Sequence, residues 1–537
     1  MNRRLFAVFA TLTNIIALAQ TDVDAIRYSQ TQAYGDARFM AMGGAFGSLG
    51  ANVSCMNYNP AGIAMYRKGE FVFTPGVQLQ TADATHYGTG ATDFSSKLNI
   101  SNIGFVAAWD QQQGGYQSNS QPYNNGGRGG YGPGYGGGRN RRQQPPPRQN
   151  STPSSHRWAL GIDYNRISDF NSHTTINGYV PAANSIMSSM ASAANGYAQN
   201  NLNPFYEGLG YNTYLINPIT SNGQNVDTTG TSTQYQGLNT FPTPVAGAMI
   251  QQTKTIQSSG RTGELAFALA HSFSDKFYIG GTLGIPIIKY NYQSTLTEYD
   301  YKNVNPYFQS LQYQENVSTS GAGVNFKLGG IYRFNSGLKV GLYGQTASYY
   351  KLTDNYQNSL TANLKGTLDS ASGTATSPAG SYTYKLRTPG RAGVSVSYVF
   401  KKLLAVSVDG EYVNYSNARL SDNAGSFDGV NQTIQQKYTG TANIKAGAEL
   451  NIRPVVFRVG VASYGSPFGN VLSGQFVRNS LSGGIGFRGA HKVYLDLGFV
   501  YTMWSETYYV IDPSFVNPSN INYAKTYITA TLGIKFN

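Results

Sequence analysis

Hydrophobic and polar residues alternate along most of the chain after about residue 260. The pattern is clearest in the last segment, where every second position is apolar: Ile528, Ala530, Leu532, Ile534 and Phe536. The positions between them carry mainly Thr and Lys. Alternation with a period of two is typical of an antiparallel strand with one apolar and one polar face. Similar segments recur along the chain and predict an all-β protein.

The pattern predicts about fourteen strands, with boundaries uncertain by ~2 to 4 residues. They cover residues 70–81, 96–110, 156–168, 260–272, 276–294, 312–334, 338–350, 383–400, 403–418, 433–450, 455–465, 478–489, 492–507 and 525–537. Many exceed the ~5 to 6 residues usual in soluble sheets and reach the ~9 to 11 that a tilted strand needs to cross a bilayer. An even strand number is also what single-chain bacterial outer-membrane barrels have.

The connections between these strands alternate between short and long. Tight turns are expected at residues 274–275, 335–337, 401–402, 451–454 and 489–491, and longer connections at 82–95, 169–259, 295–311, 351–382, 419–432, 466–477 and 508–524. Outer-membrane barrels have short periplasmic turns and long extracellular loops. Residues 70–537 are therefore predicted to form a transmembrane antiparallel β-barrel of about fourteen strands.

The first residues resemble an export signal. Arg3 and Arg4 precede an apolar stretch from Leu5 to Leu18, and Ala17-Leu18-Ala19 fits the small-x-small cleavage pattern. We predict a signal peptide over residues 1–19. A retained anchor is the alternative, which the short stretch disfavours.

Residues 20–69 do not alternate and are rich in Gly and Ala, as expected for a compact hatch that plugs the barrel; a periplasmic tail is the alternative. The run 37–66 contains Met42-Gly43-Gly44-Ala45 and Asn57-Tyr58-Asn59-Pro60-Ala61-Gly62. It resembles the N-terminal hatch of FadL/TodX-type outer-membrane transporters for hydrophobic compounds, and residues 388–394 and 458–468 resemble late strands of that family. The candidate hatch residues are Gly43, Gly44, Asn59, Pro60, Ala61 and Gly62.

The resemblance implies a mechanism. In this family, a ligand such as a long-chain fatty acid binds outside and passes by rearrangement of the hatch and a lateral gap beside a kinked third strand. Residues 161–171 occupy the third-strand position here. The candidates for the lateral gap are Asn165, Arg166, Asp169 and Phe170, and an ordinary strand end is the alternative.

Residues 169–259 are predicted to form a long extracellular loop with a short helix after Pro181. Apolar side chains are unusually dense in it, and exposed apolar patches often mark binding sites. The candidates for ligand capture are Ile186, Met190, Leu202, Phe205, Tyr206, Leu209 and Tyr214. Alternatively, these side chains pack against one another and against the other loops. Arg166, Lys327, Arg333 and Lys445 lie at polar-face positions where a carboxylate ligand could find a cation.

The charge is low in density but positive overall: 39 Lys and Arg residues against 26 Asp and Glu residues give +13, and only 12% of residues are charged. Residues 111–155 contain Arg128, Arg139, Arg141, Arg142 and Arg148 and no acidic residue. This Gly-, Gln- and Pro-rich insert is expected to be disordered, on the periplasmic side of the barrel. Arg-Gly-Gly runs also occur in RNA-binding tails, but export makes nucleic acid a poor partner.

The sequence carries no recognised catalytic or metal-binding motif, and its five His residues are scattered. The single Cys55 cannot form an internal disulfide bond. We expect no enzyme activity, catalytic residues, metal or cofactor. The predicted function is outer-membrane transport of hydrophobic compounds in a Gram-negative bacterium, with lipid and lipopolysaccharide as surroundings; a non-transporting scaffold for an outer-membrane protein partner is the alternative.

Overall fold

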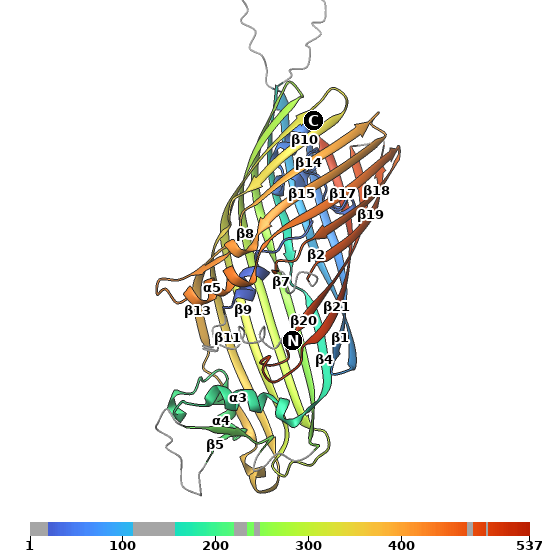
Figure 1. Ribbon diagram of the computed structural model, residues 1–537. Coiled ribbons are helices and arrows are strands. Elements are labelled where there is room, and N and C mark those ends of the chain that lie inside the picture. Colours follow the sequence, from blue (N-terminus) through green and yellow to red (C-terminus); the bar gives the residue numbers. More distant parts are fainter. Residues whose placement is uncertain are drawn as a thin grey trace, which may run out of the picture.

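The computed structural model describes residues 20–110, 156–219, 233–240, 247–469, 476–489 and 492–536. They form a large antiparallel barrel with short helices inside it and at one end (Figure 1). The strands of the main sheet are β1 Gly69–His86, β2 Thr89–Asp110, β3 His156–Asp169, β4 Ser172–Pro181, β7 Met249–Phe273, β8 Phe277–Asp300, β9 Phe308–Arg333, β10 Leu338–Gln345, β11 Tyr349–Leu364, β12 Gly373–Thr376, β13 Gly380–Arg387, β14 Arg391–Phe400, β15 Leu404–Asn414, β16 Arg419–Ser421, β17 Gly440–Ile452, β18 Val455–Tyr464, β19 Arg478–Arg488, β20 Val493–Tyr508 and β21 Ser519–Phe536.

The sheet closes on itself, because β21 pairs with β1. Three pairs of segments each continue one strand of the wall: β3 with β4, β10 with β11, and β13 with β14. β12 and β16 add only short side pairings, so the wall has fourteen strands. The prediction of an antiparallel barrel of about fourteen strands is confirmed.

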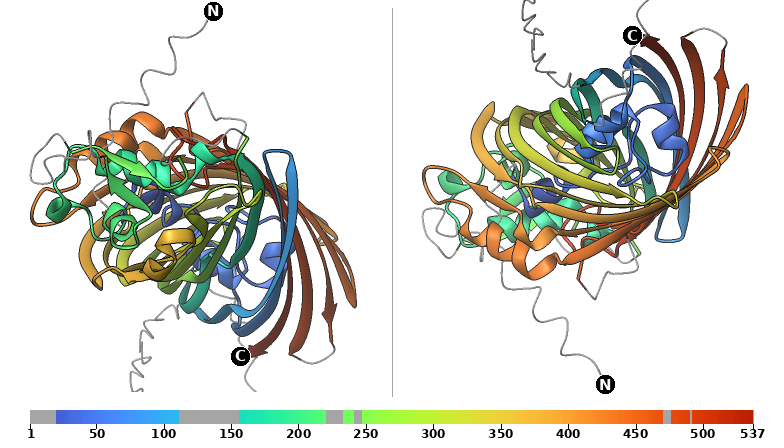
Figure 2. Two further views of the ribbon diagram at one scale, coloured as in Figure 1. Left: turned by 90° about the horizontal axis from the view of Figure 1, so that it is seen from below. Right: turned by 90° about the horizontal axis from the view of Figure 1, so that it is seen from above.

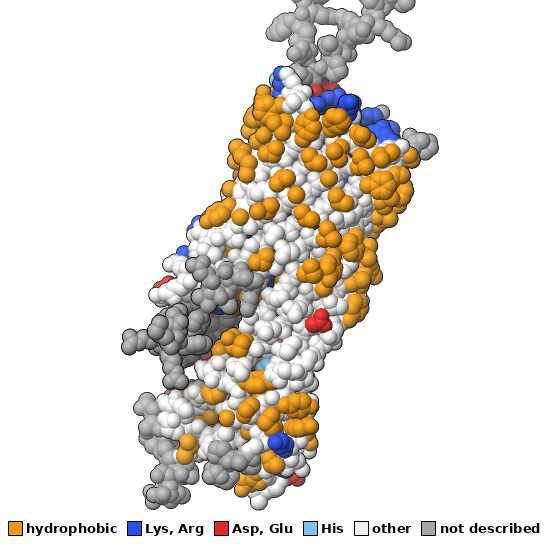
Figure 3. Space-filling view, turned by 45° about the vertical axis from the view of Figure 1, so that its right-hand side comes forward, with side chains coloured by type: hydrophobic (Ala, Val, Ile, Leu, Met, Phe, Trp, Pro, Cys, Tyr) orange, Lys and Arg blue, Asp and Glu red, His pale blue; other side chains and the backbone are white. Residues whose placement is uncertain are grey.

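Side chains alternate between the lumen and the outer surface along each strand. The outward-facing Phe267, Ile287 and Val324 are exposed, whereas the inward-facing Ala268 and Ile288 are buried. Figure 3 shows apolar side chains in orange over the upper part of the wall, toward the end that carries the C-terminus in Figure 1. A closed barrel with an apolar outer belt can cross a bilayer, because it leaves no strand edge unpaired in lipid.

Several strands are much longer than a bilayer requires. β7, β8 and β9 contain 25, 24 and 26 residues, and a tilted strand needs only ~9 to 11 to cross. Beyond the apolar belt, outward positions carry polar residues such as Gln257, Asn291 and Asn316. The outer halves of these strands therefore stand clear of the apolar belt.

The long strands differ from the sequence expectation of a loop over residues 169–259. β4 occupies residues 172–181, and β7 already begins at Met249. Polar residues such as Gln252 and Lys254 interrupt the inward-facing apolar positions there, and the outward-facing positions are polar as well. The alternation that marks a membrane strand is therefore lost, although the backbone pairing continues.

Tight turns lie at the end of the barrel that holds the C-terminus (Figure 1). Ser274 and Asp275 join β7 to β8 with φ of +55° and +51°, and Lys401 and Lys402 join β14 to β15 with φ of +46° and +59°. Two successive left-handed residues match the turns whose twist suits a hairpin. Both predicted turns are confirmed. The predicted signal peptide and the insert 111–155 lie outside the described residues.

Residues 20–68 lie in the lumen as a hatch (Figure 2, right). The hatch contains the helices α1 Asp22–Arg27 and α2 Ala37–Ala41 and the 3-10 helices η1 Val53–Asn57 and η2 Pro60–Met65. Asn59 begins η2, because its Oδ1 accepts the backbone N–H of Ala61 at 3.2 Å and Pro60 holds the first helical position. Gly62 packs so closely against Cys55 that a Cβ would overlap it.

Glycines of the wall make room for the hatch. A Cβ at Gly329 would overlap Asn59, and a Cβ at Gly447 would overlap Met42. Gly43 has φ of +63° and lies against the backbone of Val461, which leaves no space for a side chain. The strand sequence and the hatch sequence are thus matched to each other at points of backbone contact.

A small cluster of helices and strands covers the opposite end of the barrel (Figure 2, left). It contains η3 Ala182–Asn184, α3 Ile186–Ala194, η4 Gln199–Asn201, α4 Glu207–Asn212, β5 Ile216–Pro218 and β6 Tyr235–Gly237. Further helices in the later connections are η5 Gly366–Ala371, η6 Tyr415–Asn417 and α5 Asp428–Lys437. Within the described ranges, no helix combines the length and the apolar character needed to cross a membrane.

Candidate functional site

The third strand of the wall is broken between β3 and β4. The pairing of β3 with β7 shifts register between Arg166 and Ser168, and β3 ends at Asp169. The backbone N–H of Phe170 donates to the carbonyl of Gly260 at 3.1 Å, and the Phe170 side chain is buried. The break lies at the residues that the sequence suggested for a lateral gap.

Those four residues now have defined surroundings. Asn165 donates from Nδ2 to the carbonyl of Tyr34 in the hatch at 3.1 Å. Arg166 forms an ion pair with Asp169. Phe170 points into the lumen, so all four are anchored inside the barrel, and their role in a gap stays a prediction.

The ladder between the second and third strands is incomplete. β2 pairs with β3 only from Asn102↔Asn165 to Asp110↔Arg157. Its outer half, residues 89–101, pairs only with β1, and β4 pairs only with β7. Figure 2, left, shows the outer end of the blue β1–β2 hairpin beside the teal β4. The wall therefore has an edge without backbone hydrogen bonds at this place.

Side chains close this edge. Gln78 Nε2 on β1 donates to the carbonyl of Asn171 at 3.1 Å, and Gln80 Nε2 donates to Ser172 Oγ at 2.7 Å. Asp93 on β2 accepts the backbone N–H of Thr175 and lies 3.1 Å from His173 Nδ1. We call Asp93 with its two partners on β4 the β2–β4 latch.

Several buried polar atoms near this edge lack a hydrogen-bond partner within the described part of the chain. They are Gln78 Oε1, Gln80 Oε1, Asn99 Nδ2, Asn102 Oδ1 and Arg166 Nε. A buried polar atom without a partner costs about 1–3 kcal/mol. These atoms keep unused hydrogen-bonding capacity beside the unpaired edge.

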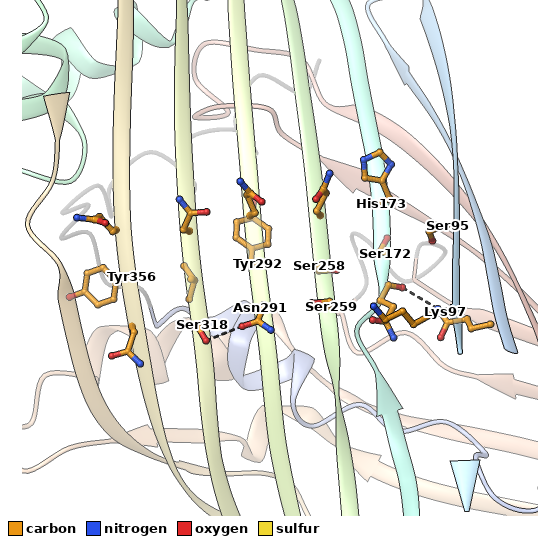
Figure 4. A pocket seen from close by; sticks show the side chains of 18 of the residues that line it. Ser95, Lys97, Ser172, His173, Ser258, Ser259, Asn291, Tyr292, Ser318 and Tyr356 are labelled. Carbon is orange, nitrogen blue, oxygen red and sulfur yellow. Dashed lines mark hydrogen bonds between the residues drawn. The ribbon is translucent and has the colours of Figure 1, made fainter. Parts of the chain in front are cut away.

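A cavity of about 910 Å³ lies beside the edge. Its lining runs from β2 and β4 across β7, β8, β9 and β11 to β13, so it lies on the concave, inner side of the wall. Figure 4 shows lining side chains at one level of neighbouring strands, among them Ser258, Tyr292 and Tyr356. Lys97 of β2 and Ser172 of β4 also line it, on the two sides of the unpaired edge.

Apolar clusters flank the cavity on both sides. The outer cluster contains Ile176, Ile250, Leu296, Leu311 and Leu360 of the wall together with the apolar core of the helical cover. In the inner cluster, Phe170 packs edge-to-face against Tyr28 of the hatch at 5.8 Å and Tyr290 of β8 at 5.4 Å. The strand break is thus in direct contact with the N-terminal part of the hatch.

The predicted capture residues separate into three groups. Ile186, Met190, Leu202 and Leu209 are buried in the core of the helical cover. Phe205 and Tyr206 face the lumen, since Phe205 packs 5.1 Å from Tyr356 of the cavity lining and Tyr206 packs 5.9 Å from Tyr313 of β9. Tyr214 is 52% exposed. Capture of a ligand by this set stays a prediction.

Burial shifts the pKa of two ionisable groups that do not belong to the strands of the wall. It raises the pKa of the Glu207 carboxyl in α4, which accepts the backbone N–H of Asn203 at 2.8 Å. It raises the pKa of the Cys55 thiol in the hatch to about 12, which makes a reactive thiolate scarce.

The hatch leaves little space on the other side of the inner cluster. The two further pockets described hold about 30 Å³ each, and one of them lies among Glu264, Lys327 and Arg391. Lys327 forms an ion pair with Glu264, and Lys445 lies over the Tyr58 ring at 4.9 Å. These cations, like Arg166, are engaged within the protein.

A buried ion network fixes the hatch to the wall. Arg38 binds Glu449 of β17 through two hydrogen bonds of 2.7 and 2.9 Å. Arg458 of β18 donates to the same carboxylate at 2.7 Å and to Asp496 of β20 at 2.9 Å. Arg488 completes the network at 2.8 Å from Asp496.

The sequence did not single out Asp93, His173 or Tyr28. Asp93 and His173 belong to connections that were expected to be loops, so no strand parity was assigned to them. Tyr28 lies nine residues before the hatch motif that begins at Ala37, and only the fold brings it to Phe170. Lys97 faces the lumen because the β1–β2 ladder shifts register opposite Thr74 and Pro75; parity counted from the outward-facing Phe105 would place it outside.

Known structures resemble this fold. A Pseudomonas aeruginosa FadL homologue matches with a TM-score of 0.51 at 11% identity, over 94% of this chain and 99% of that chain. This is the FadL fold. The P. putida toluene transporter TodX matches with a TM-score of 0.49 at 9% identity, over 94% and 99% of the two chains. No protein-family model and no curated protein matches the sequence.

Among the described residues, no three His, Cys, Asp or Glu side chains gather as a possible metal site. The FadL fold supplies instead a hatch, a cavity and an interrupted wall.

Proposed function

We propose that this protein transports hydrophobic compounds across the outer membrane, with long-chain fatty acids as the expected ligands. The observation that carries the proposal is the cavity that adjoins the unpaired edge between β2 and β4. A solute in this cavity has apolar clusters on two sides and a wall opening held by a few side chains. A shared fold alone would not identify a function.

The proposed route has three stages. A ligand enters between the helical cover and the wall, where Phe205 contacts Tyr356. It occupies the cavity, and it leaves laterally when the β2–β4 latch opens. Movement of Tyr28 would loosen Phe170 and the strand break, so rearrangement of the hatch would help to open the edge.

The cavity suits an amphipathic ligand. Val317 and the rings of Tyr292 and Tyr356 offer apolar contact, whereas Gln78 and Ser258 offer hydrogen bonds. Lys97 is exposed toward the lumen and has no ion-pair partner in the described ranges. An ammonium group here can pair with a carboxylate head group.

Filling the cavity tests the proposal. In Val317→Trp, the large ring occupies the cavity, and uptake of a labelled long-chain fatty acid by cells should fall to the level of cells without the protein. Ser320→Trp is the matched control, because Ser320 lies on the same strand, is exposed on the outward face and is not one of the residues that line the cavity. That variant should retain uptake.

The decisive comparison is uptake by cells with and without the chain, for the fatty acid and for a small aromatic hydrocarbon. Equal uptake by cells with and without the chain, for both probes, would contradict the proposed transport function. Loss of uptake in the Ser320 control as well as in the Val317 variant would show a folding defect instead of a blocked cavity.

A non-transporting scaffold is the second candidate, and two observations favour it. The two pockets described beside the hatch hold about 30 Å³ each, and the outer halves of the strands and the helical cover extend beyond the apolar belt. Unchanged uptake of every probe, together with an outer-membrane protein that co-purifies with the chain, would support this candidate.

A further inference from the structure

A row of basic side chains follows the outer edge of the apolar belt on one flank of the barrel. On β8, the exposed Ile287 is followed at the next outward position by Lys289, and on β11 the exposed Tyr349 is followed by Lys351. The row contains Arg261 on β7, Lys289 on β8, Lys351 on β11, Lys385 and Arg387 on β13, and Arg419 on β16.

The register places these residues opposite one another. Arg261 is paired across the ladder with Lys289, Lys351 with Lys385, and Arg387 with Arg419. Residues directly opposite have Cβ atoms ~4.5 to 5.5 Å apart, and like charges in such pairs repel. Three like-charged pairs in one row call for a counter-charge.

The protein does not provide that counter-charge within the described residues. No ion pair within 4.0 Å joins any member of the row to Asp or Glu there. Arg261 donates to the Tyr164 hydroxyl at 2.8 Å, and Arg419 donates to backbone carbonyls. The carboxylates on the same strands, such as Glu264 and Asp354, point into the barrel and are buried.

The row is confined to one flank. Beyond the apolar belt on the opposite flank, outward positions carry Ser505 on β20, Ala524 on β21 and Thr81 on β1. A general need to anchor the barrel at the membrane boundary would place basic side chains all round. The one-sided arrangement instead matches a discrete anionic partner.

We propose that this row binds the phosphate groups of an outer-leaflet lipid of the lipopolysaccharide type. The row adjoins the apolar belt, so its partner needs acyl chains beside the belt and negative charge directly above it. Basic clusters at a membrane boundary bind anionic lipid head groups, and paired cations suit a head group with more than one phosphate. The interaction does not depend on the proposed transport function.

The test uses the full barrel, purified in an uncharged detergent and titrated with lipopolysaccharide. The variant Lys289→Gln/Lys351→Gln/Lys385→Gln removes three charges from the row. The control Lys276→Gln/Lys401→Gln/Lys402→Gln removes three charges from exposed turns at the other membrane boundary. All substituted side chains face outward, and circular dichroism verifies that both proteins keep the barrel.

Affinity should fall roughly a hundredfold in the row variant, because each basic residue near anionic lipid contributes a factor of about five. The control should bind as the unaltered protein does. Lipopolysaccharide without its phosphate groups should bind the unaltered protein no more tightly than intact lipopolysaccharide binds the row variant. Equal affinity of both variants for lipopolysaccharide would overturn the proposal. It would also be overturned if inorganic phosphate occupied the row and prevented the lipid from binding.

Discussion

The half of the barrel that holds the hatch and the half beyond it are built on opposite principles. Around the hatch, wall strands pair along their length, glycines admit the hatch backbone, and a network of ion pairs from Arg38 to Arg488 joins the hatch to the wall. In the outer half, β2 and β4 form no ladder with each other, and a cavity of about 910 Å³ remains. The well-packed part of the wall and the part with an unpaired edge therefore lie at different levels of the same barrel.

This separation is what the proposed lateral route through the wall requires. A substitution in the hatch half removes buried ion pairs or close contacts between the hatch and the wall, so it should mainly lower the free energy of unfolding. A change at the unpaired edge alters a few side-chain contacts around an opening, so it should mainly change passage. Substitutions in the two halves test this distinction.

The largest effect is expected in the hatch half, from Arg458→Met. Glu449 and Asp496 would each lose a buried hydrogen-bonded cation, which should lower the free energy of unfolding by about 3 kcal/mol. Urea unfolding followed by Trp fluorescence would measure it. Arg458→Lys keeps the charge and should lose less; an unchanged unfolding midpoint in the Met variant would contradict the anchoring role.

An intermediate effect is expected at the β2–β4 latch, from Asp93→Asn. The amide accepts a hydrogen bond without the charge, so the closed edge should lose about 1 kcal/mol and uptake should rise up to about fivefold. Uptake of labelled fatty acid measures the change. Asp83→Asn is the control, because Asp83 lies on the same hairpin and faces outward, where it accepts from Thr92 at 2.7 Å. Equal effects of both variants would argue against a latch.

The smallest effect is expected from Lys97→Gln. An exposed cation contributes about 1 kcal/mol or less to a carboxylate contact. The variant should therefore raise the KM for fatty acid uptake modestly and leave uptake of an aromatic hydrocarbon unchanged. An equal loss of uptake for the fatty acid and the aromatic hydrocarbon would show that Lys97 does not bind the carboxylate.

The strand pattern alone could predict the barrel, because lipid outside and polar surroundings inside impose an alternating sequence. It could also separate the hatch, where the alternation stops. It could not predict the strands at 172–181 and 249–259, since beyond the apolar belt no such alternation is imposed. Backbone pairing continues there without a sequence signal.

The candidate site was likewise predictable from the sequence only in part. The family resemblance directed attention to Asn165, Arg166, Asp169 and Phe170, and the strand break lies among them. Parity placed Lys327 and Lys445 in the lumen, but only the fold reveals that Glu264 and Tyr58 already engage them. The latch formed by Asp93 depends on two strands that lie side by side without pairing, and this juxtaposition has no local signature.

The closure of the ring has a consequence for the order of folding. The last ladder joins β1 to β21, so it links the segment that begins at Gly69 to the one that ends at Phe536. The hatch contacts β18, β19 and β20 as well as β3, so we expect it to lie between them before that ladder forms. Contact order is then at its highest for the closing step, and long-range pairing of this kind is slow. The hatch would thus act as the template around which the barrel is wound, before it serves as its plug.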